Sequence, residues 1–339
     1  MTQRGGPGSE ELADEPAAHA ELLAALEEQI LGPVHYTGEE VAERSGIALE
    51  EAEQLWVELG FPPADRRRQQ FTEADIEVLT TLRLLRDSSL VPFDEIAGMT
   101  RVLGQALSRV ATAQVQLTAA TAGFPVAGAE DVVPDTERFV EAVELSVAVN
   151  ERFIGYAWRR HLVAALHRAF DPRRDEVVGF ADLVDYTKLS SRLEASELSA
   201  LLTAFQQKAS QPVAVHGGHV VKTIGDAVLF VAPDPPSAAR AALAIRDALE
   251  EDGDAPAVRV GLAKGPVVHF EGDVYGDTVN RASRLAEMAR PDTILADDAL
   301  GTALLDLPEV TVRPLRPRRL KGIGLARSWS VRNAPKATD

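Results

Sequence analysis

The chain contains no cysteine, so disulfide bonds and thiolate metal ligands are excluded. This absence fits a reducing compartment, and we expect a cytoplasmic protein. No stretch approaches the roughly 20 apolar residues of a membrane-spanning helix, and residues 1–17 form an acidic lead-in without the apolar core of a signal peptide. Positive charge is also scarce. The formal net charge of −17 argues against general affinity for nucleic acids or anionic membranes, but it leaves room for a local basic site that binds an anionic substrate.

The length of 339 residues predicts two domains, at roughly 150 residues per domain. Residues 18–135 are predicted to form a helical domain, because apolar residues recur three and four positions apart. Within it, Thr72 and Asp75 resemble a capping box at the start of a helix. A linker helix is predicted within residues 136–174, ended by the proline of DPRRDE.

Residues 175–333 have a different pattern, in which strand-like runs alternate with amphipathic helices. The order is strand, helix, hairpin, helix, strand, which predicts an α+β domain with a ferredoxin-like βαββαβ arrangement. The predicted elements are residues 177–184, 193–210, 219–231, 235–251 and 257–264.

Two carboxylates mark one edge of this predicted sheet. In the βαββαβ arrangement the first and third strands are antiparallel neighbours. Asp182 lies near the end of the first strand and Asp226 at the start of the third, so the two side chains should lie close together. Close carboxylates repel each other unless they share a proton or a cation. Carboxylate oxygens are suitable ligands for Mg²⁺ or Mn²⁺, and the phosphates of a nucleotide would complete the coordination shell of the ion. On the hairpin alone, a local salt bridge between Lys222 and Asp226 is an equal alternative.

Four motifs, in their order and spacing, resemble those of class III nucleotidyl cyclases: FADLVDYT, VKTIGDAVLF, GDVYGDTVNRASRL and LKGIG. The likeness covers about residues 175–333, half of the chain. It implies an enzyme that converts ATP into 3′,5′-cyclic AMP and pyrophosphate. It also implies a homodimer in which each active site is completed across a head-to-tail interface.

The resemblance implies a role for each matching residue. Asp182 and Asp226 match the family's metal-binding aspartates, which hold two divalent ions, Mg²⁺ or Mn²⁺, over the triphosphate. Lys222 and Asp273 match the purine-selecting pair of adenylyl cyclases. Adenine offers an acceptor at N1 and a donor at N6, which a lysine and a carboxylate satisfy, whereas guanine presents the reverse.

Asn280 and Arg284 lie four residues apart, on one face of a predicted helix. They match residues that orient the ribose and stabilise the transition-state phosphate, although a solvated helix face is the plain alternative. Lys321 matches a lysine that contacts the triphosphate.

Two positions depart from the family. Asp185 replaces a glycine that lets backbone amides approach phosphate, so it adds repulsion near the metal site, and Arg281 replaces a small apolar residue and has no assigned role.

Residues 36–80 resemble the winged helix-turn-helix start of MerR-type regulators. This resemblance raises the alternative of a non-catalytic, nucleotide-sensing transcription regulator. In such modules the second helix meets DNA, but here it reads ALEEAEQLWVE, and its four carboxylates should repel phosphate. The basic run is short, residues 66–68. We therefore expect no nucleic-acid binding and interpret the helical domain as regulatory.

The arrangement as a whole resembles actinobacterial adenylyl cyclases whose helical N-terminal domain restrains the catalytic dimer and responds to pH. The predicted linker carries His161 and His167 among arginines, and histidine titrates near neutrality. A linker helix whose order changes with pH is one hypothesis, and two ordinary surface histidines are the simpler alternative. The sequence predicts an adenylyl cyclase regulated by its N-terminal domain.

Overall fold

A computed structural model describes residues 23–121, 136–170, 176–253 and 255–335. The acidic lead-in predicted at residues 1–17 lies outside these ranges. The chain divides into two compact units, Met1–Leu166 and His167–Asp339, and each has hydrophobic clusters of its own.

The first unit is helical, as predicted. Its helices are α2 (Gly38–Ser45), α3 (Leu49–Glu58), α4 (Glu73–Asp87), α5 (Phe93–Thr121) and most of α6 (Thr136–Ala169). The capping box at the start of α4 is confirmed, because the backbone N–H and the hydroxyl of Thr72 donate to the Asp75 carboxylate at 2.7 and 2.9 Å. The observed bounds of α6 also confirm a long helix within residues 136–174.

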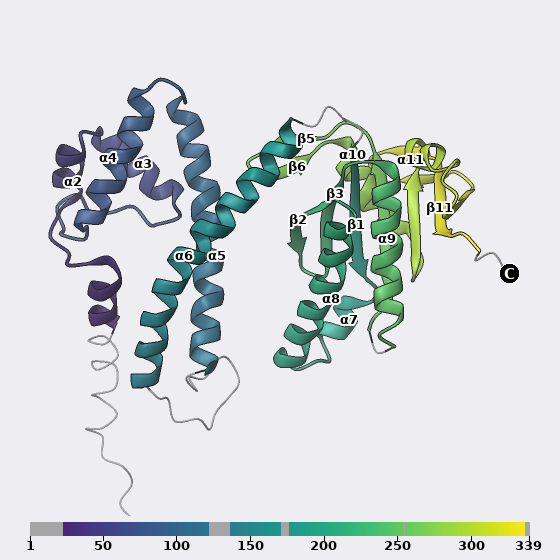
Figure 1. Ribbon diagram of the computed structural model, residues 1–339, viewed down its shortest axis with the longest axis horizontal. Coiled ribbons are helices and arrows are strands. Elements are labelled where there is room, and N and C mark those ends of the chain that lie inside the picture. The colour runs from purple at the N-terminus through teal and green to yellow at the C-terminus, as the bar shows by residue number, and fades with distance from the viewer. Residues whose placement is uncertain (1–22, 122–135, 171–175, 254, 336–339) are drawn as a thin grey trace, which may run out of the picture. The chain divides into compact units, whose positions relative to one another are not determined.

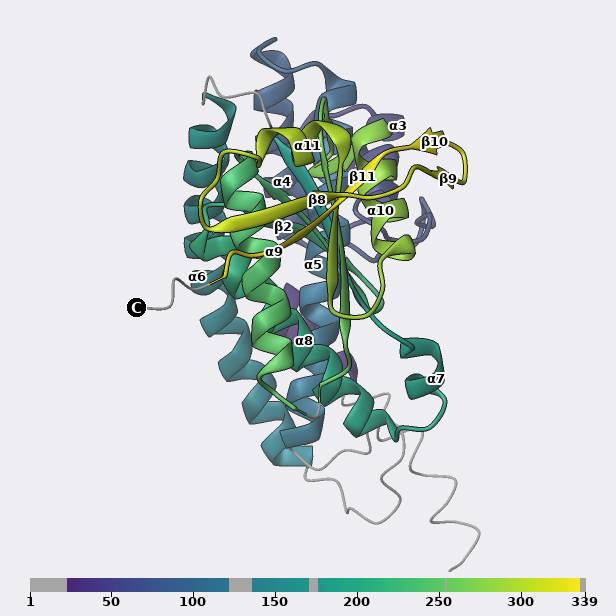
Figure 2. The ribbon, with the colours of Figure 1, turned by 90° about the vertical axis from the view of Figure 1, so that its right-hand side faces the viewer.

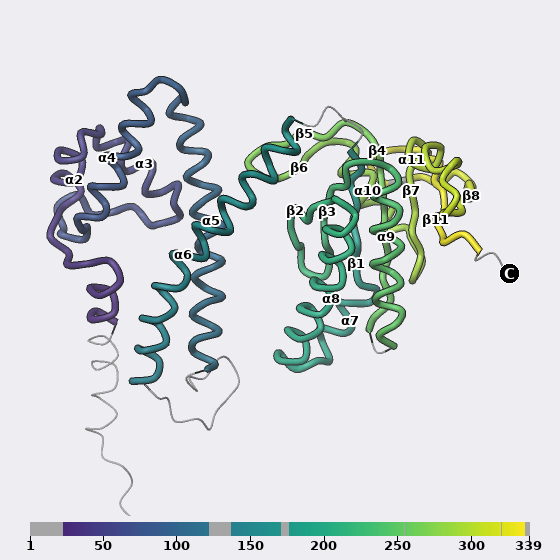
Figure 3. The backbone as a smooth tube through the Cα atoms, in the orientation of Figure 1, coloured from purple at the N-terminus to yellow at the C-terminus, as the bar shows by residue number. Residues whose placement is uncertain are grey.

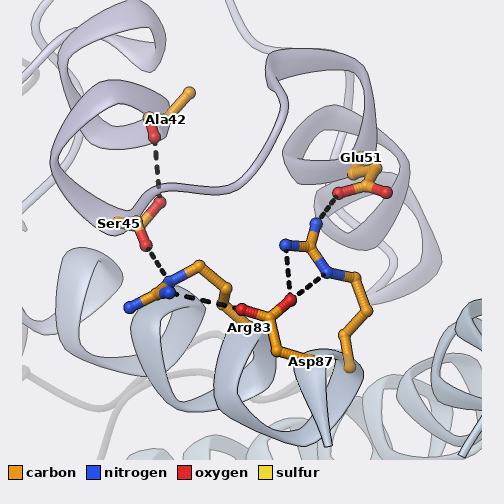
Figure 4. A network of polar contacts seen from close by, with 6 residues as sticks. Ala42, Ser45, Glu51, Arg83 and Asp87 are labelled. Atoms are coloured by element: carbon orange, nitrogen blue, oxygen red, sulfur yellow. Dashed lines mark hydrogen bonds and ion pairs between the residues drawn. The ribbon is translucent and has the colours of Figure 1, made fainter. Parts of the chain in front are cut away.

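A network of polar contacts ties α2, α3 and α4 together (Figure 4). Arg83 donates to the backbone oxygen of Ser45 at 2.8 Å and pairs with Asp87 at 3.3 Å. Arg86 pairs with the same Asp87 at 2.8 Å and also with Glu51 of α3. One carboxylate of the helix that would face DNA in a MerR-type module, Glu51, is therefore bound within the unit.

The two longest helices, α5 and α6, lie side by side within the first unit (Figures 1 and 3). The Gln114 side chain of α5 donates to the Ser146 hydroxyl of α6 at 2.6 Å. Despite their lengths of 29 and 34 residues, neither these nor the other helices in the described part of the chain are apolar enough to cross a membrane.

The second unit is built on a seven-stranded sheet with the order β2-β3-β1-β4-β7-β11-β8. The strands are β1 (Val177–Leu183), β2 (His219–Ile224), β3 (Ala227–Ala232), β4 (Val258–Lys264), β7 (Thr293–Asp297), β8 (Val310–Pro314) and β11 (Ser328–Asn333). Strand β1 is antiparallel to both β3 and β4. With helices α8 (Ala195–Val215) and α9 (Pro235–Glu250), strands β1 to β4 form the predicted βαββαβ arrangement, which is confirmed.

Helices cover both faces of this sheet (Figure 2). Because side chains alternate along a strand, Val177 and Ala181 of β1 join the core beneath α8 and α9, whereas Val178 packs with Ala282 of α10 (Asp277–Met288). Helix α10 comes so close to β4 that a Cβ on Gly261 would lie 2.2 Å from the Ala282 oxygen. The smaller elements are α7 (Tyr186–Ser190), α11 (Asp298–Ala303), and the hairpins β5 (Val268–Phe270) with β6 (Asp273–Tyr275) and β9 (Arg318–Leu320) with β10 (Gly324–Ala326).

Candidate active site

The structure brings Asp182 and Asp226 together. Gly225 and Asp226 form the two-residue turn between β2 and β3, where Gly225 has a φ of 60° that favours glycine. Asp226 thus lies in the turn itself, one residue before the strand start at which the sequence placed it. The Leu183 N–H donates to the Asp226 backbone oxygen at 3.2 Å, and Asp182 lies opposite Ala227. The two carboxylates therefore lie at the same edge of the sheet.

The Asp182 carboxylate also contacts Arg259, which was not predicted from the sequence. Arg259 lies opposite Asp182 in the β1–β4 register, and its Nη2 donates to Asp182 Oδ2. Burial raises the pKa of Asp182, the Arg259 charge opposes this effect, and the Asp226 carboxylate raises the pKa further. The Nε of Arg259 is buried without a hydrogen-bond partner among the described residues. A charge inside the apolar strand sequence VRVGLA was the signal that could have identified this arginine.

Lys222 and Asp273 also form a pair, so the alternative of a salt bridge between Lys222 and Asp226 is wrong. Lys222 follows an irregularity in β2, and its Nζ donates to Oδ2 of Asp273, the first residue of β6. Their side chains are 37% and 20% exposed, so the pair is open to a ligand. Burial raises the pKa of Asp273, but hydrogen bonds from Lys222 and the Val274 N–H, with the lysine charge, leave it below its ordinary value.

Helix α10 carries Asn280 and Arg284 one turn apart. Asn280 is exposed, and Arg284 is partly buried. The Arg284 Nη1 donates to both carboxylate oxygens of Glu287, at 2.6 and 2.7 Å. Lys321 is exposed in the turn between β9 and β10. The bond to Glu287 uses only Nη1 of the Arg284 guanidinium.

The structure assigns a role to Arg281, the cation without a role in the sequence. Its Nε donates to the buried Asp297 carboxylate at 3.2 Å, and its Nη2 donates to the Lys264 backbone oxygen at 3.3 Å. Asp297 also accepts from the Leu300 N–H at 2.9 Å, as the N-cap of α11. Arg281 thus anchors α10, with its two site residues, to the end of β7.

The other departure, Asp185, follows β1 in a left-handed conformation with a φ of 58°. Glycine adopts this conformation freely, whereas aspartate is one of the few other residues that tolerates it. The Asp185 carboxylate accepts a hydrogen bond from Lys188 of α7 at 2.8 Å. The charge that was expected to repel Asp182 and Asp226 is therefore partly offset by a lysine.

Asp182 and Asp226 fit a divalent metal ion. Two adjacent carboxylates supply the hard oxygen ligands that Mg²⁺ and Mn²⁺ prefer, and their mutual repulsion favours a bound cation. The described residues contain no group of three or more histidine, cysteine, aspartate or glutamate side chains able to hold a metal. Two protein ligands fit a site whose remaining oxygens come from substrate phosphates and water.

A histidine outside the predicted linker, His219, has a strongly shifted pKa. His161 and His167 are exposed on α6, whereas His219 on β2 is partly buried. Burial, followed by the charge of Arg168, lowers the pKa of His219 from 6.5 to about 4, although Glu176 opposes this shift.

We therefore expect His219 to weaken the fold in acid. Its folded-state pKa lies below its unfolded value, so the stability it contributes is present above pH 6.5 and is lost as the pH falls toward 4. Between pH 7 and pH 5, the free energy of unfolding of His219→Gln should fall by about 1 kcal/mol less than that of the wild type. This figure allows for solvent screening. Thermal unfolding at both pH values checks this, with exposed His161→Gln as the control, and equal losses in all three proteins would contradict it.

The sheet, its two faces of helices and the paired carboxylates define a class III cyclase catalytic domain. Residues 171–330 match the family described as the adenylate and guanylate cyclase catalytic domain. The chain is 32% identical to an adenylate cyclase of Streptomyces coelicolor, over 97% of this chain and 96% of that protein. It is 36% identical to an adenylate cyclase of Streptomyces griseus (84% and 72% covered) and 28% identical to a pH-sensitive adenylate cyclase of Mycobacterium tuberculosis (90% and 80% covered). The chain belongs to this family of nucleotidyl cyclases.

Proposed function

We propose that this protein is an adenylyl cyclase that converts ATP into 3′,5′-cyclic AMP and pyrophosphate. The observation that carries this proposal is the Lys222–Asp273 pair in the same unit as the Asp182–Asp226 pair. The first pair offers a donor and an acceptor that match adenine N1 and N6. The second offers the carboxylates for metal-assisted phosphoryl chemistry. The names of the similar actinobacterial proteins support the same substrate.

The resemblance to class III cyclases implies the roles that we propose for the residues. Asp182 and Asp226 would hold two divalent ions, which when bound supply Lewis-acid activation of the ribose 3′-hydroxyl and charge balance on the leaving pyrophosphate. Arg259 orients Asp182 through its hydrogen bond. Asn280 would orient the ribose, and Arg284, which bonds to Glu287 through its Nη1, would bind the phosphate that develops charge in the transition state. Lys321 contacts the triphosphate.

We further propose that two copies of the chain complete each site head to tail. Asp182 and Asp226 come from one copy, and Lys222, Asp273, Asn280 and Arg284 come from the other. Lys222 and Asp226 lie only four residues apart, yet in this chain Lys222 pairs with Asp273 rather than with Asp226. This separation of neighbouring side chains supports their assignment to two different sites.

We propose a regulatory role, with a response to pH, for the helical unit, and several contacts argue against the DNA-binding alternative. On α3, Glu53 pairs with Arg66 and Glu58 with Arg101, each at 2.5 Å. Arg66 belongs to the short basic run that could have contacted DNA. Its pairing with a carboxylate leaves less positive charge for a phosphate backbone. The similarity to a pH-sensitive cyclase over 90% of this chain supports the regulatory proposal.

The test is cyclic AMP formation from ATP by the full chain, with Mg²⁺ or Mn²⁺, between about pH 5.5 and 8. Asp226→Ala should lower kcat/KM at least about 1,000-fold, or about 4 kcal/mol, because it removes a metal ligand. The control is Asp252→Ala, which removes an exposed aspartate paired with Lys208 and should change kcat/KM less than about twofold. A folded wild-type chain that forms no cyclic AMP under any of these conditions would overturn the proposal.

A further inference from the structure

An exposed ion pair lies next to the metal-binding edge of the sheet. Asp185 lies three residues after Asp182, and its carboxylate accepts from Lys188 Nζ at 2.8 Å. The side chains of Lys188 and Asp185 are 71% and 61% exposed. The hydrogen bond and charge of Lys188 lower the pKa of Asp185, and the charge of Arg259, which is paired with Asp182, lowers it further, so this pair lies within electrostatic reach of the proposed metal site.

The backbone fixes where the pair lies. The Leu183 N–H donates to the Asp226 oxygen at 3.2 Å, and the Val184 N–H donates to the Ala257 oxygen at 2.8 Å. The Asp185 carbonyl accepts from the Lys188 N–H at 2.9 Å and thereby begins the single turn of α7. Lys188 is thus held on a short, bonded segment that begins at the metal aspartates.

We propose that Lys188 is a further substrate-binding residue. Its ammonium separates from the Asp185 carboxylate and binds the triphosphate of the nucleotide. Asp185 then acts as an internal competitor that weakens substrate binding. This inference rests on the proposed function, because it assumes that the triphosphate lies over Asp182 and Asp226.

The charges favour this exchange. An exposed lysine–carboxylate pair contributes little to stability, so little is lost when it separates. A triphosphate carries several negative charges and more acceptor oxygens than one carboxylate, and the flexible lysine stem lets the ammonium move between the two. Three carboxylates lie at or close to this edge of the sheet, Asp182, Asp226 and Asp185, and Arg259 is already bound to one of them. Of the two cations, Lys188 has the weaker existing contact, because its partner Asp185 is exposed, whereas Asp182, the partner of Arg259, is mostly buried.

The experiment compares the Michaelis constants of Lys188→Met, Asp185→Asn and the double variant of the full chain. Lys188→Met should raise KM for ATP about five- to tenfold, with kcat within about twofold of wild type, because a ground-state contact is removed. Asp185→Asn should lower KM about two- to fivefold, because the lysine is released. In the Lys188→Met background the same Asp185→Asn change should have a smaller effect, since no lysine remains to be released.

The matched control is Lys208→Met, which removes a lysine of α8 that pairs with Asp252 and lies outside the proposed site. Its KM should not change. Inhibition by inorganic triphosphate should weaken in Lys188→Met by the same factor as KM, whereas inhibition by adenosine should stay the same. This difference assigns the contact to the phosphates rather than to the nucleoside.

Calorimetric binding of inorganic triphosphate in the presence of Mg²⁺ gives a readout that does not need turnover. If Lys188→Met weakens this binding while the wild type makes no cyclic AMP, the lysine site stands and the cyclase proposal fails. If the wild type turns over ATP and Lys188→Met changes neither KM nor triphosphate binding, the proposal is overturned and Lys188 and Asp185 form a surface ion pair only.

Discussion

Two inactive variants should restore each other's activity when they are mixed. Asp226→Ala removes a proposed metal ligand from one half-site, and Arg284→Ala removes the guanidinium proposed to bind phosphate in the other. In a head-to-tail dimer, random exchange makes about half of the molecules heterodimers, each with one intact site of two, so about one quarter of wild-type activity should return. Each variant alone should stay below about 1% of wild type, since it lacks a group that acts in the transition state.

A second mixture serves as the control for this experiment. If both aspartates of a site come from one chain, each site of the heterodimer formed by Asp182→Ala and Asp226→Ala lacks one aspartate. If the two aspartates came from different chains, one of the two sites would be intact and the other would lack both. Because both aspartates lie at one edge of one sheet, we expect no recovery from this mixture. If the Asp226→Ala and Arg284→Ala mixture also recovers nothing while chains exchange, the sites are not shared between copies.

The purine preference should follow the Lys222–Asp273 pair. Lys222→Glu combined with Asp273→Cys should lower the ratio of kcat/KM for ATP to that for GTP at least about 100-fold, because a site built from hydrogen bonds discriminates strongly against the wrong pattern. Glutamate accepts from guanine N1 and N2, which adenine cannot satisfy. Cyclic AMP and cyclic GMP formation under the same conditions measure the ratio.

Both substitutions are needed, because Lys222 and Asp273 are bonded to each other. Lys222→Glu alone puts two carboxylates side by side and should lose ATP turnover without a gain in GTP turnover. This single variant is therefore the control for the double variant. An unchanged preference for ATP in a folded double variant would show that the pair does not read the base.

Some features followed from the sequence alone because they depend on local periodicity and connection. The capping box of Thr72 and Asp75 needs residues only three apart. The alternation of strands and helices predicted the βαββαβ order, and that order predicted that Asp182 and Asp226 would meet, since the turn between β2 and β3 must lie beside the end of β1. The family motifs then indicated the chemistry of the remaining site residues.

Other features were decided only by the tertiary structure, because they depend on register between segments far apart in the chain. Arg259 lies 77 residues from Asp182, and only the β1–β4 pairing places them opposite each other. Arg281 contacts Asp297 because α10 packs against the sheet. Val184, the residue before the left-handed Asp185, is held by a bond from its N–H to the Ala257 oxygen, which lies far along the chain. A strand pattern determines which face a side chain lies on, but the neighbour across the sheet is determined by hydrogen-bond register and helix packing, which the pattern does not contain.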